Sequence, residues 1–164
     1  MVLDHNKVYL LLGSNMGARL QLLDNAIAKI SNQIGEILER SSVYETAAWG
    51  KTDQPNFLNV AVAVSTELTP LEVLSRALQI EVELGRIREE KWGARLIDID
   101  IIFYGNEVLN IPHTLDIPHP EMHKRKFVLE PLTEIAPELQ HPVFKKSVST
   151  LLHELNDQLE VTSI

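Results

Sequence analysis

The sequence contains no cysteine, and it is poor in several other features that define protein classes. Without a thiol, the chain can form no disulfide, no thiolate metal site and no covalent thiol intermediate. No wholly apolar run exceeds a few residues, far short of the roughly 20 that a membrane-spanning helix needs. The first residues, MVLDHNK, also lack the basic and apolar segments of a secretory signal. We therefore expect a soluble, cytoplasmic protein with no membrane partner.

Positive charge is scarce overall, because 15 basic residues face 23 acidic ones and the net charge is −8. This balance argues against general nucleic-acid binding. Several of the basic residues nevertheless fall in two short segments: Arg86, Arg88, Lys91, Arg95, Lys124, Arg125 and Lys126. A local basic patch on an acidic protein suggests a small polyanion as ligand. Any one of these residues, taken alone, is better explained as a solvated surface charge.

Length and composition favour one folded domain. The 164 residues are 45% hydrophobic, and a chain of this length buries about two thirds of its unfolded surface. No internal repeat and no linker divides the sequence. Residues 1–164 are therefore predicted to form a single domain, and we expect it to be a monomer.

Apolar spacing predicts four strands, at residues 8–12, 37–46, 57–66 and 96–104. A helix should follow the first strand, after a turn at Gly13-Ser-Asn15. Its apolar positions recur every three or four residues, at Leu20, Leu23, Ile27, Ile30 and Ile34. In the third strand, alternation places Phe57 and Asn59 on one face and the leucine and valines at 58, 60, 62 and 64 on the other.

The second helix has the clearest start in the chain. Thr69 can cap it, Pro70 suits its first position, and Glu72 completes a capping box. Gly85 can end it. Its predicted apolar stripe consists of Leu71, Leu74, Leu78 and Val82. Glu81 lies on the side of Leu74 and Leu78 and is expected to pair with a neighbouring arginine.

The predicted order is β-α-β-β-α-β, which is the split βαβ arrangement. This order indicates an α+β, ferredoxin-like fold, an antiparallel sheet with both helices on one face. Beyond residue 106 the pattern is weaker. A short strand at 107–110 and helices at 127–135 and 147–155 are predicted to form a C-terminal extension with extra helices.

The fourth strand lies in the stretch GARLIDIDIIFYG and carries two acids in an otherwise apolar sequence. Asp98 and Asp100 share one face of the strand, while Ile97 and Ile99 share the other, which should meet the helices. The two carboxylates lie roughly 6.5–7 Å apart along the strand and repel each other unless a positive group lies between them. A hard divalent cation such as Mg²⁺ suits this all-oxygen pair. A surface pair bridged to arginines explains the pattern equally well at this point.

Several motifs resemble those of one enzyme family in order and spacing. Gly93-Ala-Arg95-Leu-Ile-Asp98-Ile-Asp100 is similar to the G-x-R-x-x-D-x-D signature of 6-hydroxymethyl-7,8-dihydropterin pyrophosphokinases. The other matches are Gly13-Ser-Asn15, Asp53-Gln-Pro-x-Phe57-x-Asn59, Glu81, Gly85-Arg86-x-Arg88, Trp92-Gly93, Pro118-His119, Arg125 and Phe127. The resemblance covers residues 8–138, nearly the whole chain.

The resemblance implies an enzyme of folate biosynthesis. It would transfer pyrophosphate from ATP to the hydroxymethyl group of the pterin and release AMP. Asp98 and Asp100 would bind two magnesium ions, and Arg86 and Arg95 would be catalytic residues that stabilise the transferring group. The family resemblance also implies ATP contacts from Arg88, Ile101, His119 and Arg125.

The resemblance also implies a pterin site. A pterin is a flat heteroaromatic that needs stacking surfaces and hydrogen bonds. The implied contacts come from Thr46, Ala47, Trp49, Phe57, Asn59, Trp92 and Phe127. Phe57 stands where relatives often have tyrosine, and Thr114 stands where some have arginine. Two polar loops, at residues 47–56 and 86–95, are expected to close over MgATP and the pterin.

Other functions fit the sequence less well. A non-catalytic ferredoxin-like binding module explains the fold but gives Asp98 and Asp100 no role. An RNA-binding domain of similar topology is opposed by the acidic charge and the missing RNP1 pattern. His119-Pro-Glu-Met-His123 lacks the His-Glu start of a zinc hydrolase motif. His5, His113, His141 and His153 show no ligand spacing and are expected to lie on the surface.

Overall fold

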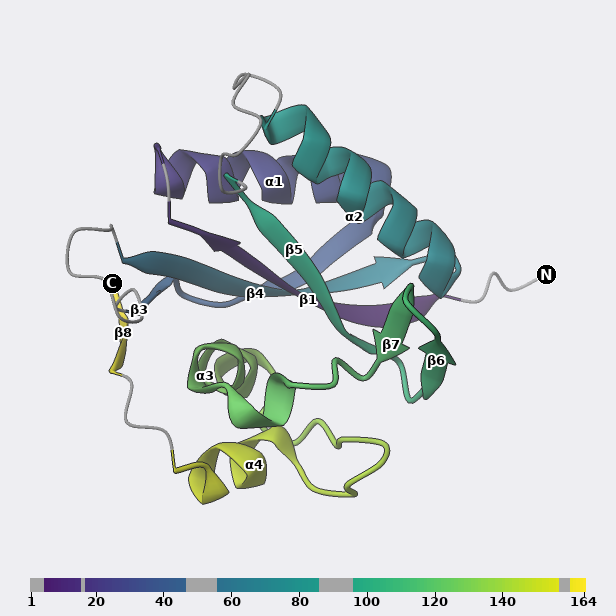
Figure 1. The fold of residues 1–164 in the computed structure, drawn as a ribbon, viewed down its shortest axis with the longest axis vertical. Helices are drawn as coiled ribbons and strands as arrows, with labels where there is room; N and C mark the ends of the chain where they lie inside the picture. The colour runs from purple at the N-terminus through teal and green to yellow at the C-terminus, as the bar shows by residue number, and fades with distance from the viewer. Residues whose placement is uncertain (1–4, 16, 47–55, 86–95, 157–159) are drawn as a thin grey trace.

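The computed structural model describes residues 5–15, 17–46, 56–85, 96–156 and 160–164. A six-stranded antiparallel sheet forms its centre, in the order β5-β1-β4-β3-β8, and β2 also pairs with β4 (Figure 1). The strands are β1 (Asn6–Ser14), β2 (Gly35–Arg40), β3 (Tyr44–Thr46), β4 (Phe57–Thr66), β5 (Asp98–Tyr104) and β8 (Val161–Ser163). The predicted ferredoxin-like α+β arrangement is confirmed.

Helices cover both faces of this sheet. Helices α1 (Arg19–Gln33) and α2 (Pro70–Gly85) lie on one face, as predicted, and α3 (Lys126–Ile135) and α4 (Val148–Glu154) lie on the other (Figure 1). The extension also contains the hairpin of β6 (Leu109–Ile111) and β7 (Leu115–Ile117) and the short 3₁₀ helix η1 (Met122–Lys124). None of the helices in the described ranges combines the length and apolar character needed to cross a membrane.

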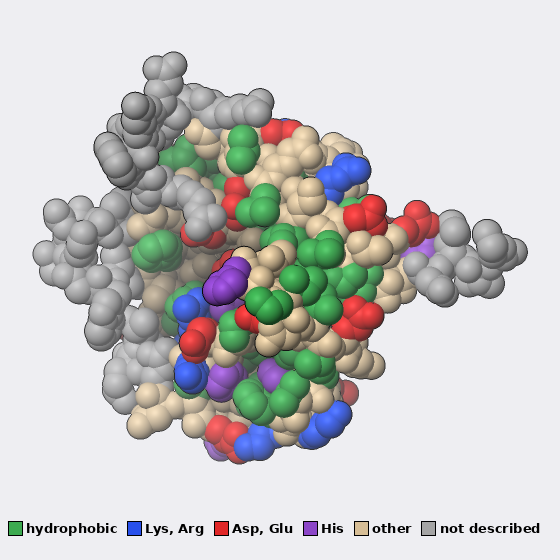
Figure 2. All heavy atoms as spheres, turned by 45° about the vertical axis from the view of Figure 1, so that its right-hand side comes forward, with side chains coloured by type: hydrophobic (Ala, Val, Ile, Leu, Met, Phe, Trp, Pro, Cys, Tyr) green, Lys and Arg blue, Asp and Glu red, His purple; other side chains and the backbone are tan. Residues whose placement is uncertain are grey.

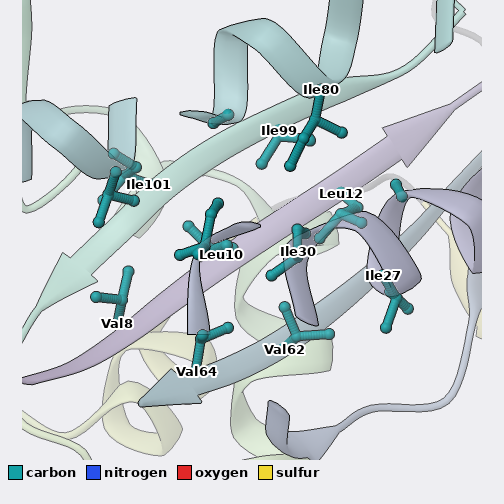
Figure 3. Packing of buried hydrophobic residues seen from close by; sticks show 14 of the residues in the cluster. Val8, Leu10, Leu12, Ile27, Ile30, Val62, Val64, Ile80, Ile99 and Ile101 are labelled. Atoms are coloured by element: carbon teal, nitrogen blue, oxygen red, sulfur yellow. The ribbon is translucent and has the colours of Figure 1, made fainter. Parts of the chain in front are cut away.

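Alternate side chains of β1 and β4 point to opposite faces of the sheet and pack into two hydrophobic cores. Leu10 and Leu12 of β1 meet Ile30 of α1 and Ile80 of α2 in the first core (Figure 3). The odd-numbered neighbours Tyr9, Leu11, Ala61 and Ala63 face α3 and α4 in the second core. The two alanines are small, so α3 can pack closely against β4.

The helix stripes were only partly predicted. In α1, Leu20 is 51% exposed, while the buried side chains are Leu23, Ala26, Ile27 and Ile30. In α2 the predicted stripe is wrong, because Leu71, Leu78 and Val82 are about half exposed and the buried residues are Val73, Ala77, Ile80 and Leu84. Both sets in α2 follow helical periodicity, so spacing alone could not choose between them.

The helix start and the third strand were predicted correctly. The amide of Thr69 donates to the Glu72 carboxylate at 2.9 Å, and the Glu72 amide donates to the Thr69 hydroxyl at 3.3 Å. Strand β4 occupies the predicted residues. The predicted strand 37–46 is instead two strands, β2 and β3. They are separated at Ser41, whose hydroxyl accepts a bond from the Ala61 amide at 2.9 Å.

Candidate active site

The two aspartates lie at the start of edge strand β5. Ile99 and Ile101 belong to the core under α1 and α2, so Asp98 and Asp100 project from the opposite face, as predicted. Both aspartates are only partly buried. In the described part of the chain, no cluster of three or more histidine or acidic residues is arranged to hold a metal ion. A cation here would therefore take its remaining ligands from water or from a bound phosphate.

A row of paired residues connects this acidic pair to the residues expected to bind the pterin. Gly13 of β1 lies opposite Asp98 of β5 on one side and opposite Asn59 of β4 on the other. Directly opposed residues point to the same face of a sheet, and two strand spacings amount to roughly 9–10 Å. Asp98 and Asn59 therefore stand on one face with only a glycine between them.

The close approach of Asn59 favours glycine at position 13, because any larger residue would displace the Asn59 amide. A Cβ atom at residue 13 would lie 2.6 Å from Oδ1 of Asn59. Gly13 and Ser14 belong to β1 and do not form the predicted turn. The buried Ser14 hydroxyl donates to the Leu96 carbonyl at 2.7 Å, which ties the end of β1 to the segment that leads into β5.

The expected pterin contacts in the described residues come from three elements. Thr46 of β3 lies opposite Phe57 of β4, so both share the face of Asn59. Asn59 and Thr46 are 5% and 4% exposed, and the buried Oγ1 of Thr46 has no hydrogen-bond partner in the described part of the chain. A buried polar atom without a partner is unusual in a protein and is explained if a ligand satisfies it. Phe127, on α3, packs partly buried above this same face.

A carboxylate on α3 holds β3 in place. Glu134 accepts hydrogen bonds from the Ser42 amide at 3.0 Å and from the Tyr44 hydroxyl at 2.6 Å. Burial and the contact with Glu134 raise the pKa of Tyr44 well above its usual range, so the tyrosine keeps its proton as a donor. Sequence reasoning missed this anchor, because the partners lie about 90 residues apart in the chain.

His119 lies beside the outer edge of β5, and Arg125 is close enough to affect its pKa. The His119 amide donates to the Ile102 carbonyl at 3.0 Å, and its Nδ1 accepts from the Glu121 amide at 3.1 Å. The neutral ring therefore carries its proton on Nε2. Burial lowers the pKa of His119, and the charge of Asp100 opposes that effect. Arg125 also contributes to the lowering, so all three residues belong to one electrostatic site.

Ile101 is 5% exposed and its side chain is in the first core. Any contact it makes with a nucleotide would have to use its backbone.

A hollow of about 300 Å³ adjoins His119 on the side of the β6–β7 hairpin. Figure 2 shows histidine side chains among hydrophobic ones on this face. Phe144 stacks on His141, with ring centroids 4.1 Å apart, and the His123 ring meets Phe144 edge-on at 4.8 Å. Nδ1 of His123 is buried without a hydrogen-bond partner. The walls are thus flat and largely apolar, with a few polar groups.

The histidine predictions were partly wrong. His5, His113 and His153 are exposed, as expected, but His141 is only 4% exposed. Its Nδ1 accepts from the amides of Val143 and Phe144 at 3.2 and 3.1 Å. Burial and the nearby His123 lower the pKa of His141. Its burial could not be predicted from spacing, because the Phe103 ring that meets it comes from β5, distant in the sequence.

Six of the predicted site residues lie outside the described ranges. They are Arg86, Arg88 and Arg95 from the basic segment, with Ala47, Trp49 and Trp92. The two loops predicted to close over the substrates fall largely in the same gaps. The described chain stops at Thr46 and Gly85 and resumes at Asn56 and Leu96. Thr46 places one end beside Phe57, an expected pterin contact, and Leu96 places another end just ahead of Asp98.

The chain is similar to known proteins over most of its length. A sequence model of the 7,8-dihydro-6-hydroxymethylpterin-pyrophosphokinase family matches residues 9–137. The 2-amino-4-hydroxy-6-hydroxymethyldihydropteridine pyrophosphokinase of Aquifex aeolicus is 45% identical over 139 residues, which are 85% of this chain and 86% of that protein. The Methylorubrum extorquens protein of the same name is 47% identical over 135 residues, 81% of this chain and 84% of its own length.

Longer proteins match as well. The folic acid synthesis protein fol1 of Pneumocystis carinii is 39% identical over 155 residues, which are 94% of this chain but 21% of that protein. A crystal structure of Plasmodium falciparum HPPK-DHPS superposes with a TM-score of 0.76 at 18% identity. It covers 93% of this chain and 46% of the solved chain. That structural likeness supports the fold alone.

Proposed function

The chain belongs to the 7,8-dihydro-6-hydroxymethylpterin-pyrophosphokinase family, and we propose that it diphosphorylates 6-hydroxymethyl-7,8-dihydropterin with ATP as co-substrate. The products are the pterin diphosphate and AMP, and the step belongs to folate biosynthesis. The observation that carries this proposal is the row Asp98–Gly13–Asn59, which places a carboxylate pair and a buried amide on one sheet face. Their separation suits a pterin whose hydroxymethyl arm points at a metal-bound phosphate.

The reaction moves one diphosphoryl group. The hydroxymethyl oxygen attacks the β-phosphorus of ATP, and an O–P bond forms. The bond between the β-phosphorus and the α–β bridging oxygen breaks, AMP leaves with that oxygen, and the hydroxyl proton passes to water. No covalent enzyme intermediate is needed, so positioning and charge stabilisation are what the protein must supply.

Asp98 and Asp100 are the residues that would hold magnesium. Two ions per site are proposed, because a carboxylate pair with a triphosphate offers enough oxygen ligands for both. When bound, magnesium supplies charge neutralisation at the transferring diphosphoryl group. The aspartates determine where magnesium would neutralise the negative charge of that group. This place is at one end of the row that Asp98 forms with Gly13 and Asn59.

The pterin would lie on the sheet face formed by β3 and β4. Asn59 is buried and can bond the amide-like edge of the ring, while Thr46 offers a buried hydroxyl that has no hydrogen-bond partner among the described residues. Phe57 is 36% exposed and can stack on the ring, with Phe127 of α3 on the opposite side. Ala47, Trp49 and Trp92 are proposed as further contacts on the family resemblance.

The nucleotide would lie along the outer edge of β5. Neutral His119 can donate its Nε2 proton to a phosphate oxygen, and Arg125 adds a positive charge near His119. The hollow next to His119 offers flat apolar walls to the base or ribose. Backbone contact from Ile101, binding by Arg88, and transition-state stabilisation by Arg86 and Arg95 complete the proposed set. The continuous sheet between the two cores supports one domain, which we propose acts as a monomer.

A product assay tests the reaction. Purified protein is mixed with ATP, Mg²⁺ and 6-hydroxymethyl-7,8-dihydropterin, and the nucleotides are separated. AMP should appear in a one-to-one ratio with pterin diphosphate. ADP in place of AMP would show transfer of a single phosphoryl group and overturn the proposal. Pterin binding without any turnover would favour the non-catalytic binding module instead.

Removal of either carboxylate sharpens this test. Asp98→Asn and Asp100→Asn should each lower kcat at least about a hundredfold, because they remove metal ligands worth several kcal/mol. Pterin affinity measured without magnesium should stay within about twofold of the unsubstituted protein. Asp24→Asn, which breaks only the surface ion pair with Arg40, is the matched control and should leave kcat unchanged. Equal turnover in all three variants would contradict the assigned metal site.

A further inference from the structure

Within the described ranges, edge strand β5 has a neighbouring strand on one side only. Strand β1 pairs with it on the inner side, so the outward N–H groups need another acceptor. At the end that carries the aspartates, Glu81 of α2 supplies that acceptor. The Ile99 amide donates to Oε2 of Glu81 at 2.7 Å, across 18 residues of sequence.

The position of this bond matters because Ile99 is the residue between Asp98 and Asp100. Its N–H belongs to the peptide unit that joins it to Asp98, and its carbonyl joins it to Asp100. A bond to this amide therefore fixes the peptide unit that directly follows Asp98 and leads through Ile99 to Asp100. An N–H bond to a carboxylate is short and about twice as strong as a neutral one.

Glu81 is itself held firmly by its helix. Ile80 and Leu84 on either side of it are buried in the first core, at 0% and 7% exposure. The helix is therefore a rigid support for the carboxylate. The hydrogen bond of Ser14 to the Leu96 carbonyl secures the segment just before the strand. These two ties act on either side of Asp98.

We propose that Glu81 is a positioning residue for the metal site. It substitutes for a missing strand and sets the spacing and direction of Asp98 and Asp100 through the Ile99 amide. This inference rests on the proposed function, because it concerns the metal that the reaction uses. This role of Glu81 differs from the ion pair with an arginine that the sequence predicted. The role does not depend on whether that ion pair also forms.

The test compares two substitutions that separate hydrogen bonding from charge. Glu81→Leu removes the acceptor, whereas Glu81→Gln keeps an acceptor oxygen and removes only the charge. Glu83→Gln is the matched control on the same helix, because the Glu83 carboxylate accepts hydrogen bonds from Lys29 and Gln33 of α1. Metal binding is read by electron paramagnetic resonance of Mn²⁺ with the non-transferable α,β-methylene analogue of ATP.

We expect Glu81→Leu to weaken Mn²⁺ binding about 10- to 100-fold, the usual effect of removing a partner that orients metal ligands. Glu81→Gln should weaken it by no more than about threefold, since one hydrogen bond to a neutral acceptor is retained. Pterin affinity without metal should be unchanged in both, because Asn59 and Thr46 lie on other strands. Hydrogen exchange at the Ile99 amide should speed up in Glu81→Leu only.

Two results would overturn the proposal. Unchanged Mn²⁺ binding in Glu81→Leu would show that the acceptor does not organise the aspartates. Equal losses in Glu81→Gln and Glu81→Leu would assign the effect to charge and not to the hydrogen bond. If Glu81→Leu fails to fold, Glu81→Ala, which also lacks an acceptor, takes its place with the same expected loss of Mn²⁺ binding, and exchange at the Ile99 amide is the second measurement. Because Mn²⁺ binding needs no turnover, failure of the proposed reaction in the product assay remains distinguishable from failure of this inference.

Discussion

At the scale of single residues, the site depends on one position without a side chain. Gly13 lies between Asp98 and Asn59 in the sheet, and Oδ1 of Asn59 occupies the space that a Cβ would need. A β-carbon there would force the Asn59 amide to turn or β4 to shift. The sequence drew attention to Gly13 for another reason, as a turn residue. Its contact with Asn59 follows from the register of β1 and β4, which no local pattern contains.

Gly13→Ala should therefore act on pterin binding more than on metal binding. We expect the pterin Kd to rise at least about tenfold, equivalent to roughly 1.4 kcal/mol, while Mn²⁺ binding with the ATP analogue changes little. Fluorescence titration with the pterin measures this effect. In Gly35→Ala the added Cβ would press on the Ser65 backbone at the other end of β4. That control should lower stability without changing pterin affinity in the folded protein, and equal pterin affinities in both variants would refute the role given to Gly13.

At the scale of elements, the strand that carries Thr46 is short and depends on its neighbours. Strand β3 pairs with β4 on one side and with the C-terminal strand β8 on the other, where Thr46 lies opposite Val161 (Figure 1). The Ile164 amide also donates to the Val43 carbonyl at 2.9 Å. Strand β8 lies outside residues 9–137 that the family sequence model matches. It supports the strand that carries Thr46, beside the proposed pterin site.

Deletion of residues 160–164 should weaken pterin binding selectively. We expect the pterin Kd to rise roughly three- to tenfold, equivalent to the net 0.5–1.5 kcal/mol of about one hydrogen bond. The KM for ATP should stay the same, because His119 and Arg125 are held by other elements. Ser163→Ala keeps the backbone pairing and serves as the control. A deletion that leaves pterin affinity intact would show that Glu134 and β4 position β3 without β8.

The success of sequence reasoning also varied by element. Strand β4 was predicted to the residue, because its two faces carry different residue types and each faces its own core. The start of α2 was predicted because a capping box is a local signal. The buried face of α2 was missed, since Leu71 and Val73 both head a stripe at helical spacing. Only the position of the helix on the sheet decides which stripe is buried.

At the scale of the whole molecule, the two cores share one sheet and should unfold together. Leu10 and Leu11 are neighbours in β1, yet one belongs to the core under α1 and α2 and the other to the core under α3 and α4. Loss of packing on one face therefore withdraws support from the other. A small domain of this kind is expected to unfold in one cooperative transition. Protonation of a group buried beside the second core should therefore change the free energy of unfolding of the whole domain.

His141 is such a group, and it predicts a loss of stability in acid. Its ring is buried against Phe103 and Phe144, and its Nδ1 accepts two backbone amides, so only the neutral form fits. The folded-state pKa is thus below the unfolded value of about 6.5. Unfolding then takes up a proton, so the stabilisation is complete above about pH 6.5 and is lost as pH falls from there toward the folded-state pKa. His119, whose pKa is also lowered by burial, contributes in the same direction.

Urea unfolding at pH 7.5, 6.5 and 5.5 measures this dependence. The midpoint should fall with pH in the unsubstituted protein, and the fall should be smaller in His141→Gln, which cannot be protonated in this range. That variant should be less stable at pH 7.5, because Gln loses the ring stacking on Phe144, so the slope with pH and not the absolute stability is the decisive quantity. His153→Gln, at an exposed position on α4, should keep the full slope. A His141→Gln slope equal to that of the unsubstituted protein would place the acid sensitivity in other groups, with His119 the next to test.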